Sequence, residues 1–330
     1  MAFKRIRKKL NHILIIFTLI IIITISLLIG LFVILGIKNP FIFPDRIIRH
    51  PHDIFSPHKV FIEAHCGINR EIFQNTLESF SKAIEYNIES LETDVWLTKD
   101  NVLVLIHGNS KGGIDDYLDH PGNVPELTWE ELSSYKTKKD GLSVPKLRDA
   151  MKLTKNKIFI DLEIKDPRVD LVFPKVMELI EEFDFFDQIS LCSFHYKYYD
   201  KIKEYNEKNN KKIIFGFGYY PDRKNYDFSK KGNTLNIYWN YITKEICDKA
   251  HENGMAVVAW FRLKENDDVE NIENYKKIID NGVDIIISNY PVAAKKYRDS
   301  LYKKSFFSKI NINLFQNLKK SINKLFFYQY

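Results

Sequence analysis

The sequence predicts an α/β fold, a (β/α)8 TIM-type barrel preceded by one N-terminal transmembrane helix. After residue 59, short runs rich in Ile and Val alternate with single helical patterns, which is typical of a parallel sheet covered on both faces. Several helical patterns end on Asn or Asn-Gly and pass directly into a strand, as at Asn87, Asn253-Gly254 and Asn281-Gly282. About eight such units in about 250 residues fit a closed barrel better than an open sheet. The transmembrane helix is predicted by residues 13–37, an uncharged run dominated by Ile and Leu.

The N-terminal run predicts how the chain meets a membrane. At about 1.5 Å per residue, it is long enough for a bilayer core of about 30 Å. A cleavable signal peptide is the alternative, but its apolar region would span roughly 7–15 residues, and residues 36–39 make a poor cleavage site. We therefore expect residues 1–38 to be a cytoplasmic flank and signal anchor of a single-pass membrane protein. The catalytic domain would then be extracytoplasmic, lumenal or at the cell surface, because the residues before the run are basic: Lys4, Arg5, Arg7, Lys8 and Lys9.

The elements of the barrel follow a proline-rich linker. Residues 39–58 contain Pro40, Pro44, Pro51 and Pro57, which interrupt any regular element. We expect the barrel at residues 59–300. Its strands are predicted at 60–64, 90–96, 102–106, 158–164, 189–193, 213–216, 234–238, 256–260 and 284–288. Its helices are predicted at 76–86, 128–135, 146–153, 169–182, 196–207, 244–252 and 268–280. No glycine-rich phosphate loop follows the first strand, which disfavours a dinucleotide-binding sheet.

The C-terminal residues 301–330 have a different pattern. Apolar side chains recur there at helical spacing with lysines between them, so the segment predicts a basic amphipathic helix lying on a membrane. A terminal helix packed against the barrel, or a disordered end, is an equally good interpretation. The formal net charge of +6 includes this tail and the basic N-terminal flank, and no nucleic-acid-binding motif is visible. We expect a membrane partner and no nucleic acid.

Two acidic residues on one predicted strand indicate a metal site. Glu92 and Asp94 stand two residues apart, so the pleat points both carboxylates to one face. Two carboxylates on one face repel each other unless a cation lies between them, and oxygen ligands favour a hard divalent ion. Glu163 ends another predicted strand and supplies a third oxygen ligand, with Lys165 on the same side to bind an anion.

Two histidines follow other strands at the same end of the predicted barrel. In such barrels functional side chains lie at the carboxyl ends of the strands. His65 and His107 both fall there, and two histidines beside a metal make a plausible general acid and base. Trp260 also ends a strand, and it either lines a substrate pocket or fills the barrel mouth.

From Lys59 to about Ala294 the chain resembles the glycerophosphodiester phosphodiesterase family. Members carry a His-Arg-Gly strand end, Glu-Asn-Thr before a helix, a Glu-X-Asp strand, a strand ending in His-Asp and a later Glu-X-Lys. The matching residues here are His65-Cys66-Gly67, Gln74-Asn75-Thr76, Glu92-Thr93-Asp94, His107-Gly108 and Glu163-Ile164-Lys165. Ser193-Phe194, the unit from Gly254 to Trp260 and the closing Gly282-Val283-Asp284 also fit the family pattern, in order and spacing.

The resemblance implies a barrel enzyme that hydrolyses a phosphodiester with Mg²⁺ or Ca²⁺. By position, Glu92, Asp94 and Glu163 would hold the metal ion. His65 and His107 would act as general base and acid, and Lys165 would bind the phosphoryl oxygens.

Three positions depart from the family pattern. Cys66 replaces an arginine, and a thiol cannot reproduce the bidentate phosphate contact of a guanidinium. Gln74 replaces a glutamate, and Gly108 replaces an aspartate. Lys111 and Arg70 are candidates for a cation that takes the arginine's place. We interpret Asn75 mainly as a helix cap, with Glu78 completing a capping box.

The resulting functional hypothesis is metal-dependent hydrolysis of glycerophosphodiesters to glycerol 3-phosphate and an alcohol. One alternative is a lysophospholipase D or sphingomyelinase-D-like activity on phospholipids, which uses the same groups. Another is a catalytically inactive barrel that serves as a binding or scaffold module. The substrate would be a small-molecule or lipid phosphodiester.

Overall fold

The computed structural model describes residues 60–219, 232–263 and 268–302. The predicted transmembrane run, the linker and all but two residues of the predicted tail lie outside these ranges. Within the described ranges, no helix combines the length and the apolar character needed to cross a bilayer. The single-pass topology therefore stays a prediction.

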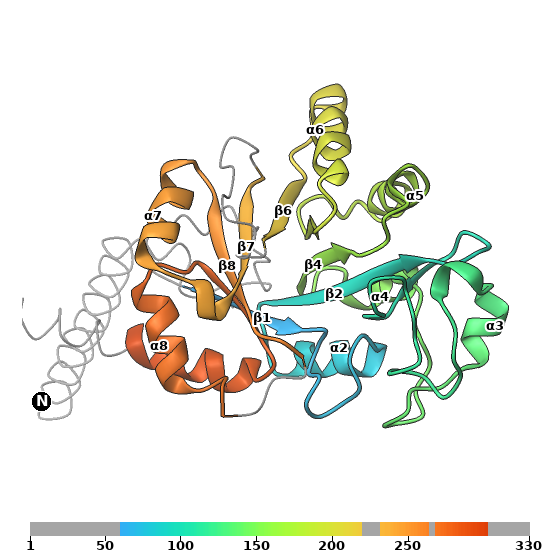
Figure 1. Cartoon of the computed structure of the whole chain (residues 1–330), viewed down its shortest axis with the longest axis horizontal. Coiled ribbons are helices and arrows are strands. Elements are labelled where there is room, and N and C mark those ends of the chain that lie inside the picture. The colour runs from blue at the N-terminus through green and yellow to red at the C-terminus, as the bar shows by residue number, and fades with distance from the viewer. Residues whose placement is uncertain (1–59, 220–231, 264–267, 303–330) are drawn as a thin grey trace, which may run out of the picture. The chain divides into compact units, whose positions relative to one another are not determined.

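Eight parallel strands form a closed ring, which confirms the predicted barrel (Figure 1). Each strand pairs with the next parallel strand in the sequence, and β1 pairs with β9 to close the ring. The ring consists of β1 (Phe61–His65), β2 (Ser90–Leu97), β4 (Phe159–Ile164), β5 (Ile189–Ser193), β6 (Ile214–Tyr219), β7 (Thr234–Tyr238), β8 (Ala256–Trp260) and β9 (Ile285–Ser288). All nine predicted strands exist, three of them with the predicted bounds.

All the helices named below except α3, which belongs to the excursion after β3, surround the ring and cover its outer face with apolar side chains (Figure 1). They are α2 (Leu77–Glu85), α3 (Trp129–Ser134), α4 (Leu147–Thr154), α5 (Val169–Glu182), α6 (Lys197–Asn209), α7 (Lys244–Glu252) and α8 (Ile272–Asp280). Asn87, Gly254 and Gly282, which the sequence predicted as left-handed ends of helices, all have positive φ. Short 3₁₀ helices, η2 (Val124–Glu126) and η3 (Trp239–Tyr241), complete the named elements.

The ninth strand, β3 (Leu103–Leu105), stands outside the ring and runs antiparallel to β2. The segment between β3 and α4 makes an excursion beside β2, and it has a small hydrophobic cluster of its own around Trp96 and Val124. This excursion carries His107 and Tyr117 and holds them at the barrel's carboxyl end.

One helix of the barrel was not predicted. Residues 291–302 are helical and carry Arg298, whose side chain is almost fully buried. Arg298 donates hydrogen bonds to the carbonyl of Val60 and to Glu89, at the amino ends of β1 and β2. This helix therefore ties the base of the barrel together.

Candidate active site

The registers of three neighbouring strands bring the predicted metal ligands to one end of the barrel. Glu92 pairs with His65 of β1 on one side, while Asp94 pairs with Glu163 of β4 on the other. Because side chains alternate across a strand, all four face the interior. Glu92 and Asp94 are buried, and Glu163 is partly exposed to the mouth.

The acidic residues gather around one ammonium group. Lys165 Nζ lies 3.2 Å from Asp94 Oδ1 and 3.0 Å from Glu163 Oε1. Burial lowers the pKa of Lys165, but the carboxylates of Asp94, Glu163 and Glu92 outweigh it and raise the pKa well above its usual value. Burial also opposes ionisation of Asp94, but Lys165 and a hydrogen bond from Asn75 hold its pKa below the usual range.

The other two carboxyl groups are not neutralised in this way. Burial, followed by the charges of Asp94 and Glu163, raises the pKa of Glu92 well above its usual value. Burial raises the pKa of Glu163 as well, although Lys165 offsets part of this effect. Ionisation of all three acids beside one ammonium group would leave an excess of negative charge, and a bound cation would balance it.

The donor set fits a hard divalent ion. One oxygen from each of Glu92, Asp94 and Glu163 can be chosen so that all three lie within 4.8 Å of one another. Carboxylate oxygens are the ligands that Mg²⁺ and Ca²⁺ take in proteins, and both ions keep positions for water or substrate. The predicted ligands therefore do form a possible metal site.

His65 lies beside this cluster at the end of β1. Its Nε2 is 3.9 Å from Glu92 Oε2, and its Nδ1 is buried without a hydrogen-bond partner among the described residues. Burial lowers the pKa of His65 to about 3 in the absence of a metal ion. The imidazole is therefore neutral near pH 7.

His107 is held from both sides. Its Nδ1 is 2.8 Å from the Gly108 carbonyl oxygen and 3.0 Å from the hydroxyl of Tyr117, while its Nε2 is 3.3 Å from Lys165 Nζ. A carbonyl only accepts and an ammonium only donates, so these contacts assign the proton to Nδ1 and the lone pair to Nε2. Burial raises the pKa of Tyr117 to about 12, so its hydroxyl stays protonated.

The structure places all three departures from the family pattern at or beside the cluster and explains one of them, Gly108. Cys66 has φ of 51° and is fully buried, with its N–H donating to Glu92 Oε2 at 3.0 Å. Gly108 also has positive φ, and a Cβ there would lie 3.1 Å from Trp96 Nε1, which disfavours the family's aspartate in this local structure. Gln74 lines the cavity described below.

The helix-cap interpretation of Asn75 was wrong. Thr76 is the N-cap of α2, and its side chain accepts from Ser79 N. Asn75 has φ of 57° and donates from Nδ2 to Asp94 Oδ2 at 2.9 Å. Its Oδ1 accepts hydrogen bonds from Thr93 and from the Asp94 N–H. Asn75 therefore orients a predicted metal ligand.

A cavity of about 440 Å³ opens over the cluster. Five of the predicted site residues line it: His65, Glu92, His107, Glu163 and Lys165. The sixth, Asp94, is fully buried and reaches the cavity only through its contact with Lys165. Part of the lining is apolar and is made by Phe194, Trp260, Leu263 and Ile287. Trp260 therefore does line the cavity, packed edge-on against Phe194.

Sequence reasoning missed three residues of this cavity: Tyr117, Phe194 as a wall residue, and Arg262. Among the described lining residues, the lysine is Lys165 and the arginine is Arg262. Arg70 and Lys111, the cations considered from the sequence, do not line the cavity. Phe194 belongs to the Ser193-Phe194 motif, and this motif could have predicted its position at the cavity. Tyr117 and Arg262 lie in loops and carried no pattern.

Comparison with known proteins agrees with this geometry. The sequence model of the glycerophosphoryl diester phosphodiesterase family matches residues 65–293, more than half of the chain. The chain belongs to this family. A glycerophosphodiester phosphodiesterase of Caldanaerobacter subterraneus subsp. tengcongensis is 25% identical over 244 residues, covering 71% of this chain and 95% of that protein. One of Bacillus altitudinis is 26% identical over 256 residues, covering 74% and 99%.

A solved structure shares the fold. The phosphodiesterase of Oleispira antarctica, in complex with the product sn-glycerol-3-phosphate, has a TM-score of 0.61 and 20% identity. The match covers 73% of this chain and 97% of that one. At this identity the comparison supports the barrel of this family member and leaves the chemistry to its own residues.

Proposed function

We propose that this chain hydrolyses glycerophosphodiesters to glycerol 3-phosphate and an alcohol. The observation that carries the proposal is the meeting of two carboxylates, two histidines and one lysine in a single cavity, with the buried third carboxylate of Asp94 paired to that lysine, in a chain that belongs to this family. Curated relatives are named glycerophosphodiester phosphodiesterases, and the Oleispira antarctica structure holds glycerol 3-phosphate.

The residues divide into proton carriers and charge carriers. His65 lines the cavity beside Glu92, and from this position it would accept a proton from the attacking oxygen nucleophile. The ammonium group of Lys165 donates a hydrogen bond to the lone pair of His107 Nε2. A phosphoryl group that binds this ammonium would draw it away from His107, and Nε2 could then take up a proton. With a proton taken up from solvent on Nε2, His107 would then protonate the leaving alcohol. Arg262 stands at the cavity as a second cation for the anionic substrate.

The proposed cofactor is a divalent cation, Mg²⁺ or Ca²⁺, held by Glu92, Asp94 and Glu163. When bound, such an ion would stabilise negative charge on the phosphoryl oxygens. Lys165 would orient the same oxygens, while Asn75 keeps Asp94 in place.

A substrate panel tests this proposal. The purified chain should release glycerol 3-phosphate from glycerophosphocholine with Mg²⁺ or Ca²⁺, and a chelator should abolish the release. Exposed Asp170→Asn is the matched control and should behave like the unmodified chain, because its carboxylate lies on the surface of α5. Absence of metal-dependent turnover with every phosphodiester tried would leave the inactive binding module as the better function.

The apolar wall of the cavity favours a second candidate, a lysophospholipid substrate. Phe194, Trp260 and Ile287 offer apolar surface beside the charged cluster, where an acyl chain gains by leaving water. Comparison of kcat/KM for glycerophosphocholine and lysophosphatidylcholine decides between the two. A higher value for the lipid would assign the phospholipase-D-like activity.

We also propose that residues 1–38 anchor the enzyme with its barrel outside the cytoplasm. The basic flank before the apolar run supports this orientation. In sealed vesicles whose cytoplasmic face is outward, added protease should spare the barrel. Digestion of the barrel in intact vesicles would contradict the orientation.

A further inference from the structure

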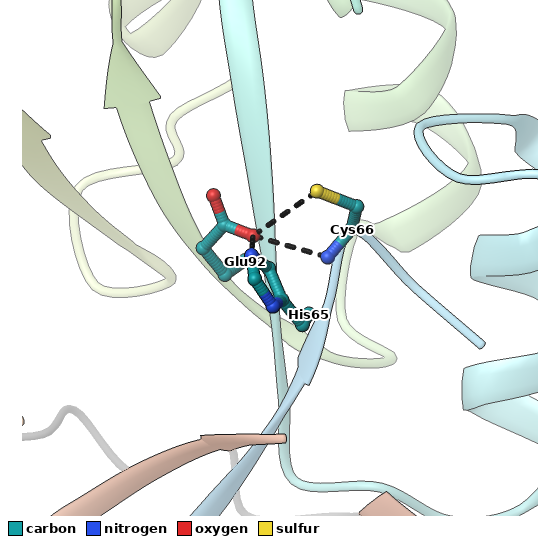
Figure 2. A group of neighbouring side chains, drawn as sticks. All are labelled: His65, Cys66 and Glu92. Carbon is teal, nitrogen blue, oxygen red and sulfur yellow. Dashed lines mark hydrogen bonds and ion pairs between the residues drawn. The ribbon is translucent and has the colours of Figure 1, made fainter. Parts of the chain in front are cut away.

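A second group of potential metal ligands adjoins the carboxylate cluster. His65, Cys66 and Glu92 each offer one ligand atom, and the three atoms lie within 4.8 Å of one another (Figure 2). Cys66 Sγ is 3.4 Å from Glu92 Oε2 and 3.2 Å from Asp94 Oδ2. All three residues are at least nine-tenths buried.

The local backbone aims the thiol into this group. Cys66 follows β1 in a left-handed conformation, which a non-glycine residue adopts only at a cost. Its N–H is bound by Glu92, and its carbonyl accepts hydrogen bonds from Ser79 Oγ and from the N–H of Asn75. The thiol is thus fixed between two carboxylates, while His65 Nδ1 is buried without a partner among the described residues.

The donor atoms differ from those of the hard-ion site. Imidazole nitrogen, thiolate sulfur and carboxylate oxygen together suit Zn²⁺, Co²⁺ or Cd²⁺, whereas Mg²⁺ and Ca²⁺ take oxygen ligands. The sulfur comes from the position where the family pattern has arginine, so this donor set is a property of this chain.

We propose that His65, Cys66 and Glu92 form a second metal site, selective for a thiophilic divalent ion, that competes with the hard-ion site. The competition follows from Glu92, which belongs to both groups. On binding, the metal–sulfur bond replaces the S–H bond, and the thiol proton leaves to solvent without any change of oxidation state. Such an ion would also occupy His65 and therefore inhibit proton transfer.

Cobalt titration of the purified full chain tests the site without relying on turnover. Co²⁺ should produce a thiolate-to-metal charge-transfer absorption band, and Zn²⁺ should remove the band by displacement. Cys66→Ser should abolish the band and weaken Zn²⁺ binding by about 100-fold or more, since even a lost outer-sphere partner costs 10–100-fold. The matched control is Cys247→Ser, a buried cysteine outside both ligand groups, which should keep the band.

Added Mg²⁺ or Ca²⁺ tests the competition. Excess hard ion should shift the cobalt titration to higher concentration, and the shift should disappear in the Glu163→Gln variant because Glu163 is a ligand of the hard-ion group and not of the thiol group. Absence of the band in the unmodified chain, or its persistence in Cys66→Ser, would overturn the site. A band that no hard ion displaces would overturn the competition.

Discussion

Strands β1 and β2 carry a charged cluster at each end, and the two clusters are built differently. At the mouth, Glu92, Asp94 and Glu163 face Lys165, and none of these side chains is more than 17% exposed. At the base, Arg298 faces Glu89 and Asp299, whose side chains are 23% and 39% exposed.

This difference indicates that the cluster at the mouth serves function and the cluster at the base serves stability. Water and backbone groups complete the base: Arg298 also binds the Val60 carbonyl, and Glu89 accepts the N–H of Ile62. The mouth holds two further buried acids whose ionised forms its own residues do not fully stabilise, and their pKa values are therefore raised. In barrels of this kind the carboxyl end carries the reaction and the amino end carries the stability. Substitutions at the mouth should therefore lower activity more than stability, and substitutions at the base should lower stability and leave activity unchanged.

The largest effect should follow removal of His65 from the mouth. His65→Ala should lower kcat by about 10²–10⁴-fold, since general acid–base catalysis contributes this much. Its melting temperature should stay close to that of the unmodified chain, because the imidazole makes few hydrogen bonds. His120→Ala, an exposed histidine on the excursion, is the control and should keep full activity. Retained turnover in His65→Ala would show that another group moves the proton.

The second largest effect on activity should come from the loss of a metal ligand. Glu92→Gln or Asp94→Asn should lower kcat/KM by about 10²–10³-fold, because a Lewis acid supplies several kcal/mol of transition-state stabilisation. A saturating ion, at 100 times its Kd, should stabilise the unmodified domain by about 2.7 kcal/mol, and the variants should lose this gain.

Chelated samples sharpen this second test. Without a divalent ion, Glu92→Gln should be at least as stable as the unmodified chain, since it removes a buried carboxyl group whose ionised form is disfavoured, whereas Asp94→Asn should be less stable because it breaks the buried pair with Lys165. Thermal unfolding with and without Mg²⁺ or Ca²⁺ measures both effects. If neither ion changes the melting temperature of the unmodified chain, the metal assignment is wrong.

At the base the expected signature is reversed. Arg298→Met should lower the free energy of unfolding by about 3 kcal/mol, the lower end of the range for breaking a buried ion pair, because Glu89 keeps some contact with water. Activity per folded molecule should not change. Urea unfolding measures the loss, and Lys244→Met, which breaks an exposed pair on α7, should show none.

The contrast between the two ends also explains what could be predicted from the sequence. Glu92, Asp94, Glu163 and Lys165 lie on or just after strands, where the pleat fixes the direction of side chains two residues apart. Their meeting at one mouth then follows from a closed parallel barrel. The helix of residues 291–302 had no such support, because its role rests on Arg298 contacts with residues more than 200 positions away.

Loop residues were beyond prediction for the same physical reason. Tyr117 reaches His107 through the fold of the excursion, and Arg262 reaches the cavity through the segment after β8. Asn75 and Thr76 are both good cap residues, so local preference alone cannot decide which one caps α2. The structure gives the cap to Thr76 and turns Asn75 toward Asp94.

The smallest effect should come from Tyr117→Phe, which removes one hydrogen-bonding partner of His107 at the mouth. A single hydrogen bond contributes about 0.5–1.5 kcal/mol, so kcat should fall by about two- to twelvefold. The imidazole keeps its contacts with the Gly108 carbonyl and Lys165, which is why the loss stays small. A positioning role predicts that the pH profile of kcat/KM shifts while KM stays constant, because the hydroxyl acts on His107 and not on the substrate. Tyr135→Phe, on a tyrosine that stacks on His120 away from the cavity, should leave the profile unchanged. An unshifted profile in Tyr117→Phe with reduced stability would mean that Tyr117 only packs the excursion against the barrel.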